Sequence, residues 1–292
     1  SREPFDHVRA ARDQGASIIQ SFHETMSREG GHLHKVLCDI VAFANTRGGT
    51  IYVGALPDNR LPPVGVANHE EAIEILKQEV RRINPPLDIS VDVVESQGMP
   101  VVRINVPEGP DRPYALDGSH IYVRQESETG LALRDEIVRL VTLNLKQQEA
   151  ARAPASAEPQ VSPQETAAMA EEFSAEGIIS PPTVGVEITE VVERNGTLYY
   201  TVKDLRNGSI VRDVTPRSAR KLWSYAIQQH QKLPMDEKEV QWHGNIGLWQ
   251  AAKRVGKTRY DFVQRDAEGR LHVYYGVTEE GVEGEWQQVL PE

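Results

Sequence analysis

The chain has 292 residues, with 32 lysines and arginines against 43 aspartates and glutamates, giving a formal net charge of −11. This acidity argues against a general polyanion binder, although it is compatible with a local basic patch. No apolar run approaches the roughly 20 residues that a bilayer span needs, so we expect no membrane segment. A single cysteine, Cys38, excludes an intramolecular disulfide framework and suits a reducing compartment, which predicts a cytoplasmic protein.

Composition divides the chain into three parts. Ala, Pro, Ser, Glu and Gln dominate residues 148–179, which carry one basic and six acidic residues. This segment has too few apolar residues to bury the surface that would offset the conformational entropy lost on folding. We therefore predict a linker, with a short helix around Glu165–Phe173. The remaining chain then forms a first domain over 1–147 and a second over 180–292.

Hydrophobic spacing predicts a mixed first domain. Apolar residues at helical intervals predict helices over His32–Asn45, His69–Arg82 and Leu133–Leu145. Alternating and β-rich runs predict strands over Thr50–Ala55, Ile89–Val94, Val101–Val106 and Ser119–Arg124. The order is not a regular βαβ series, so we predict an α+β fold rather than a doubly wound sheet.

The second domain is predicted to be a small α+β unit. Two hairpins are expected, one across Asn195-Gly196 and one joining Arg259–Arg265 to Arg270–Gly276. Helices are expected over Pro216–Gln231 and Ile246–Val255. All four tryptophans of the chain lie in this part, for which we identify no family.

The segment Ile40–Gly54, with the sequence IVAFANTRGGTIYVG, resembles the AFANT-x-GG-x-(I/L)-x-(I/V)-G signature of the Schlafen AlbA_2 domain. Asn84-Pro85-Pro86, Arg112-Pro113-Tyr114 and Ile121–Arg124 match further family segments in the expected order, so the resemblance covers about residues 10–145. It implies a mixed α/β nucleic-acid-binding domain, as in bacterial transcriptional regulators and RNA-cutting Schlafen proteins. Related domains often pair, so it also suggests a homodimer.

One departure from the family concerns catalysis. Family nucleases carry an E-x4-E-F-K segment and a later Asp, which together hold a divalent metal. Ala16 and Ser21 stand at the two glutamate positions here, and Asp58 stands at the third. One carboxylate binds Mg²⁺ or Mn²⁺ poorly, so we expect no metal, no cofactor and a catalytically inactive domain. The alternative is a metal-dependent endoribonuclease that uses Glu24 or Glu29 with Asp58 and takes Mg²⁺ or Mn²⁺.

Basic residues supply the candidate DNA or RNA contacts. Arg47 and Arg124 fall inside the matched motifs, and Arg60 follows the predicted strand over Thr50–Ala55. In the second domain the candidates are Lys253, Arg254, Lys257 and Arg259, which lie on and after the predicted helix and near aromatic residues. The sequence thus predicts a nucleic-acid-binding pseudo-nuclease, with a regulatory or defence role. A non-catalytic scaffold, whose second domain docks a protein partner, is the remaining alternative.

Overall fold

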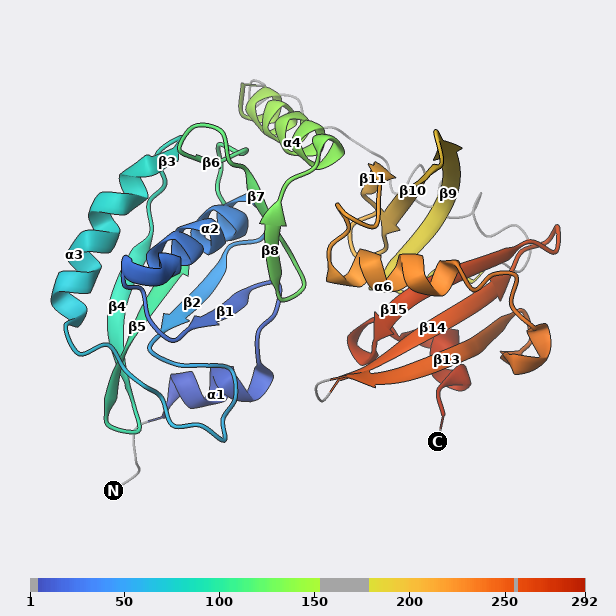
Figure 1. Ribbon diagram of the computed structural model, residues 1–292, viewed down its shortest axis with the longest axis horizontal. Coiled ribbons are helices and arrows are strands. Elements are labelled where there is room, and N and C mark those ends of the chain that lie inside the picture. The colour runs from blue at the N-terminus through green and yellow to red at the C-terminus, as the bar shows by residue number, and fades with distance from the viewer. Residues whose placement is uncertain (1–4, 153–178, 255–256, 292) are drawn as a thin grey trace. The chain divides into compact units, whose positions relative to one another are not determined.

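The computed structural model describes residues 5–152, 179–254 and 257–291. Its contacts divide the chain into two compact units, Ser1–Arg152 and Ala153–Glu292, which we describe separately (Figure 1). Both units combine helices with strands, which confirms the α+β prediction. The helix predicted at Glu165–Phe173 lies outside the described residues.

The N-terminal unit is built on a four-stranded sheet with the order β1-β2-β5-β4. Its strands are β1 (Gln20–His23), β2 (Gly49–Val53), β4 (Ser90–Ser96) and β5 (Met99–Val106). Strands β1 and β2 are parallel, and the other neighbours are antiparallel. Because β1 and β2 run in the same direction, the residues that follow both strands emerge at the same edge of the sheet.

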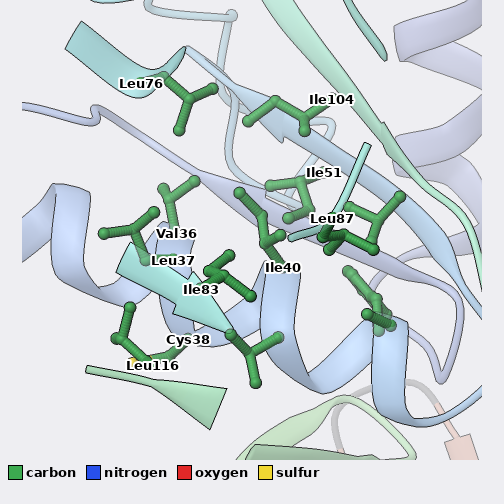
Figure 2. Packing of buried hydrophobic residues seen from close by; sticks show 14 of the residues in the cluster. Val36, Leu37, Cys38, Ile40, Ile51, Leu76, Ile83, Leu87, Ile104 and Leu116 are labelled. Atoms are coloured by element: carbon green, nitrogen blue, oxygen red, sulfur yellow. The ribbon is translucent and has the colours of Figure 1, made fainter. Parts of the chain in front are cut away.

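Helices cover both faces of this sheet. Helix α2 (His32–Asn45) has the predicted bounds, and α3 (His69–Glu79) continues into a 3₁₀ turn, η2 (Val80–Arg82). Both contribute to the main core, which Figure 2 shows between α2, β2 and β5. On the opposite face, α1 (His7–Gln14) packs Val8 and Ala11 against Tyr52 and Val101. The unit therefore has three layers, with the sheet between α2 and α3 on one face and α1 on the other.

Short strands beside α2 complete the N-terminal unit. They form two pairs, β3 (Ile83–Asn84) with β6 (Ala115–Leu116), and β7 (Tyr122–Gln125) with β8 (Glu128–Leu131). A short 3₁₀ turn, η1 (Glu29–Gly31), precedes α2, and a long helix, α4 (Arg134–Arg152), follows β8. The β7–β8 hairpin packs against α2, which brings Arg124 next to the start of β1.

The C-terminal unit is a seven-stranded antiparallel sheet with the order β11-β10-β9-β15-β14-β13-β12. Its strands are β9 (Val186–Arg194), β10 (Thr197–Asp204), β11 (Ile210–Val214), β12 (Gln241–His243), β13 (Ile246–Arg254), β14 (Lys257–Arg265) and β15 (Leu271–Thr278). Helix α6 (Lys221–His230) lies across one face, and the 3₁₀ helix η5 (Gly284–Val289) places Trp286 in the core on the other (Figure 1). Two more 3₁₀ turns, η3 (Glu237–Glu239) and η4 (Glu279–Gly281), lie in the connections.

One helix prediction in this unit is wrong, and the other helix is present but begins later than predicted. Residues 246–254 form strand β13 rather than a helix. Their Leu, Gln, Ala, Lys and Arg favour helices intrinsically, but pairing with β14 places Ile246 and Leu248 in the core at strand periodicity. Helix α6 begins at Lys221 instead of Pro216, because Thr215 and Ser218 close a turn that precedes it.

Candidate nucleic-acid interface

The end of α2 is fixed by two side chains of the Schlafen-like motif. Asn45 donates from Nδ2 to the carbonyls of Tyr114 and Tyr122, both at 2.9 Å, and its Oδ1 accepts from the Tyr114 N–H at 2.7 Å. Thr46 accepts a 3.0 Å hydrogen bond from the Arg124 N–H. These side chains thus hold the segments 114–116 and 122–125 against α2, because buried backbone groups need partners.

The two glycines that follow allow a close backbone approach. Gly48 has φ +68°, and a Cβ there would lie 2.7 Å from both the Val106 carbonyl and the Glu108 N. A Cβ on Gly49 would lie 2.5 Å from the carbonyl oxygen of Ile19. The motif therefore threads the chain tightly between β5 and the start of β1. Arg47 lies on an exposed turn between the end of α2 and these two glycines.

Arg47 is the motif residue that presents a charge to solvent. Its side chain is exposed and has no ion-pair partner among the residues that the structure describes. Arg60 is also exposed, but its guanidinium binds the Asp58 carboxylate, with contacts of 2.9 and 2.8 Å from Nε and Nη2. Arg47 is thus the freer of the two cations for a phosphate contact.

Arg124 occupies a different environment, because it is only 6% exposed. Its Nε and Nη2 donate to the carbonyls of Ser17 and Gln20, and its Cζ lies 5.0 Å from the centroid of the Phe43 ring. Burial lowers the pKa of the guanidinium, and the charge of Asp39 opposes that shift. Arg124 thus joins β7 to β1 inside the unit, where it is not available for a surface contact with phosphate.

Asp39 is the buried carboxylate of the same region. It accepts a 2.7 Å hydrogen bond from Nε2 of His23, and Nη1 of Arg124 lies 3.8 Å from its other oxygen. Burial alone would raise the pKa of Asp39, but the His23 hydrogen bond and the nearby charges outweigh it and lower the pKa. Asp39 is therefore an ionised group that holds α2, β1 and β7 together. Sequence reasoning missed this pairing, because 16 positions separate His23 from Asp39.

The positions aligned with the nuclease glutamates carry no acid. Ser21 lies on β1, 5% exposed, and its Oγ has no hydrogen-bond partner. The alternative acids, Glu24 and Glu29, are exposed, and Asp58 is held by Arg60, which lowers the pKa of Asp58 to about 2. Across residues 5–152, 179–254 and 257–291, no three His, Cys, Asp or Glu side chains are grouped so as to hold a metal ion.

The C-terminal candidates lie on a β-ribbon made by β13 and β14. Lys253 pairs with Thr258, and Arg254 pairs with Lys257, at the end of the two strands. The side chains of Lys253 and Lys257 are exposed, while Arg259 donates to the Gly276 carbonyl at 3.2 Å. The side chain of Arg254 lies outside the described part of the structure. The structure thus groups these residues on a hairpin rather than on a helix.

Comparison with known proteins finds a family model that matches most of the N-terminal unit. Residues 19–132 match the family model described as Schlafen, AlbA_2, which confirms the resemblance and indicates a nucleic-acid-related function. No curated protein matches the chain. Among solved structures, the DIP2311 protein from Corynebacterium diphtheriae is similar at 18% identity with a TM-score of 0.32, over 49% of this chain and 28% of that one. No described helix is both long and apolar enough to cross a bilayer.

Proposed function

We propose that this protein, whose residues 19–132 are a Schlafen AlbA_2 domain, binds DNA or RNA without cleaving it. The observation that carries the proposal is the exposed, unpaired guanidinium of Arg47 within the described residues, on the turn that the family motif builds. A guanidinium can donate two parallel hydrogen bonds to a phosphate, which makes an exposed arginine a suitable phosphate contact. Such a module would serve in transcriptional regulation or in defence. It would act as a homodimer or together with a protein partner.

Two further groups of residues support binding rather than cleavage. The lysine-rich end of β13–β14 adds positive charge to a chain that is acidic overall. Ala16 and Ser21, in place of two carboxylates, remove the charge that a divalent metal needs. Phosphate contacts made by a few cations release counterions, so the affinity should fall steeply with salt.

A metal-dependent ribonuclease is the second candidate, and one observation favours it. Glu24 follows β1 and Asp58 follows β2, and these strands are parallel neighbours, so both acids leave the sheet at the same edge. In that case Asp58 would have to leave Arg60 to bind Mg²⁺ or Mn²⁺.

Fluorescence anisotropy with labelled single- and double-stranded DNA and RNA, at several salt concentrations, tests the proposal. The same samples are incubated with Mn²⁺ and run on a denaturing gel. We expect salt-sensitive binding with intact oligonucleotide. Cleavage that Asp58→Ala abolishes would favour the nuclease instead. Absence of binding even at low salt would leave the scaffold alternative, to be pursued by a pull-down of protein partners.

A further inference from the structure

We propose that the C-terminal unit carries a base-stacking site for single-stranded nucleic acid, centred on Trp249 of the β13–β14 ribbon. This inference rests on the proposed function and names the kind of nucleic acid and the unit that binds it. The site, here called the Trp249 patch, consists of five residues: Trp249, Gln229, Gln250, Lys257 and Arg259.

Trp249 differs from the other three tryptophans of the chain. Trp286 is buried against Phe262 and Tyr274. The rings of Trp223 and Trp242 are covered by arginines, whose Cζ atoms lie 4.5 and 4.6 Å from the ring centroids. Trp249 is partly exposed, and within the described residues its indole has neither a ring partner nor a hydrogen bond. An indole in this state has a face available to a planar ligand such as a base.

A β-bulge determines where Trp249 lies. Leu248 pairs with Phe262 and Gln250 with Asp261, so Trp249 is the extra residue and stands with Gln250 opposite Asp261. Asp261 belongs to the sheet face that α6 covers, because Tyr225 of α6 donates to its carboxylate at 2.7 Å. The bulge that contains Trp249 thus lies next to α6, because Gln250 donates to Gln229 of that helix at 2.7 Å.

The buried carboxylate of Asp261 orients the amides of the patch. Asp261 is 0% exposed and accepts hydrogen bonds from Tyr225, the Gly276 N–H and Nε2 of Gln250. The same Nε2 donates to Oε1 of Gln229 at 2.7 Å, and Oε1 also accepts from Lys232 at 2.6 Å. Both hydrogens of the Gln250 amide are therefore used, and so is the Gln229 oxygen.

This network leaves one acceptor and one donor beside Trp249. Oε1 of Gln250 and Nε2 of Gln229 have no partner within residues 5–152, 179–254 and 257–291. Every base displays donors and acceptors along its edge, so these two groups can face a base that stacks on the indole. Because the surrounding hydrogen bonds fix both amides, little ordering entropy is lost when the base binds.

Charge on the ribbon matches a nucleic-acid backbone. Strands β13 and β14 carry the basic residues Lys253, Arg254, Lys257, Arg259 and Arg265 and a single acid, Asp261, which is buried. Lys257 and Arg259 lie two positions apart along β14, so they share the face of Asp261. On β13, Ala252 pairs with Arg259. Its small side chain leaves room above the strand between Trp249 and these two cations.

The geometry favours a single strand over a duplex. In a duplex the base faces are stacked on one another, so an indole fixed on a sheet has no base to contact. An aromatic ring next to cations on a sheet instead suits unpaired bases.

Anisotropy titrations of the full chain with a labelled 12-nucleotide single strand and with the matching duplex test the inference. We expect tighter binding of the single strand, a loss of about 5- to 100-fold for Trp249→Ala, and near-normal binding for Trp249→Phe, which keeps a stacking ring. Lys257→Glu should weaken binding, whereas Lys238→Glu, which changes an exposed lysine on η3, should not. Melting curves establish that each variant is folded.

A second measurement does not depend on any variant. An oligonucleotide carrying 5-iodouracil is photo-crosslinked to the wild-type protein, and mass spectrometry locates the attachment, which we expect on Trp249. Wild-type binding that Trp249→Ala leaves unchanged, or crosslinks confined to the N-terminal unit, would overturn the Trp249 patch and leave the proposed function standing. Absence of binding to every oligonucleotide would overturn both.

Discussion

Nη2 of Arg124 donates a 3.0 Å hydrogen bond to the backbone carbonyl of Gln20, which precedes it by 104 positions. This contact gives the arginine of the family's Tyr-Val-Arg-like segment a structural role, because a buried cation must be paired. Arg124 satisfies its charge with Asp39 and with two carbonyls at the start of β1. The exposed Arg47 has the opposite character, and the two arginines can be separated by experiment.

Arg124→Ala should destabilise the N-terminal unit by about 3–5 kcal/mol, because it removes a buried cation that bonds the Ser17 and Gln20 carbonyls and lies 3.8 Å from Asp39. Arg47→Ala should change stability by less than about 0.5 kcal/mol, as expected of an exposed residue, but should weaken nucleic-acid binding. Urea unfolding followed by circular dichroism and anisotropy at one salt concentration measure the two effects. Equal stability of both variants would contradict the buried role of Arg124.

Acid should unfold the N-terminal unit partly through Asp39. Its pKa is lowered in the folded state from the ordinary value of 3.8, so the unfolded chain takes up the proton first as the pH falls. The stabilisation by Asp39 is thus fully present above about pH 5 and is lost as the pH falls through 3.8 towards the folded pKa. Urea midpoints between pH 6 and pH 3 should fall less for Asp39→Asn than for the wild type. Parallel pH profiles of the two proteins would rule this out.

Gly48→Ala should be more damaging than Gly118→Ala. Both glycines have left-handed backbones, with φ +68° and +73°, so the conformational strain of an alanine is similar, about 1–2 kcal/mol. The Gly118 Cβ would meet nothing within 4 Å, whereas the Gly48 Cβ would lie 2.7 Å from backbone atoms at Val106 and Glu108. Overpacking should add about 1–3 kcal/mol to the cost at Gly48, which thermal unfolding of the two variants measures. Similar losses at both sites would show that the turn can relax.

Cys38 should react slowly with iodoacetamide in the native protein. Its side chain is buried on α2, and burial raises the pKa of the thiol above the ordinary value of 9.0, so little thiolate is present at neutral pH. Mass spectrometry after brief alkylation at pH 7.5 should find Cys38 unmodified in native buffer and fully modified in guanidinium chloride. Rapid native alkylation would mean that α2 opens readily.

Local sequence patterns were sufficient to predict those helices and strands in which the spacing of apolar residues matches the residues that are buried. The bounds of α2 and the β4–β5 hairpin at Gln97-Gly98 follow from spacing and turn residues alone. Strand β13 could not be predicted in this way, because its helix-favouring residues are overruled by pairing with β14. The role of Arg124 and the bulge at Trp249 also depend on partners distant in sequence, which no local pattern encodes.

Asp58→Asn distinguishes the proposed binding function from nuclease activity. Asp58 now neutralises Arg60 through hydrogen bonds from Nε and Nη2, and its pKa of about 2 keeps it ionised at any pH above about 4. Removing this charge frees an exposed guanidinium, so the binding model predicts tighter binding and a salt dependence steeper by about 0.7 to 0.9 in log–log slope. Arg60→Ala serves as the matched control, because it removes the cation and leaves the Asp58 carboxylate unpaired, so affinity should fall below that of the wild type. Anisotropy at four salt concentrations measures both variants. Metal-dependent cleavage by the wild type that Asp58→Asn abolishes, without a gain in affinity, would instead assign Asp58 to a metal site and overturn the binding-only proposal.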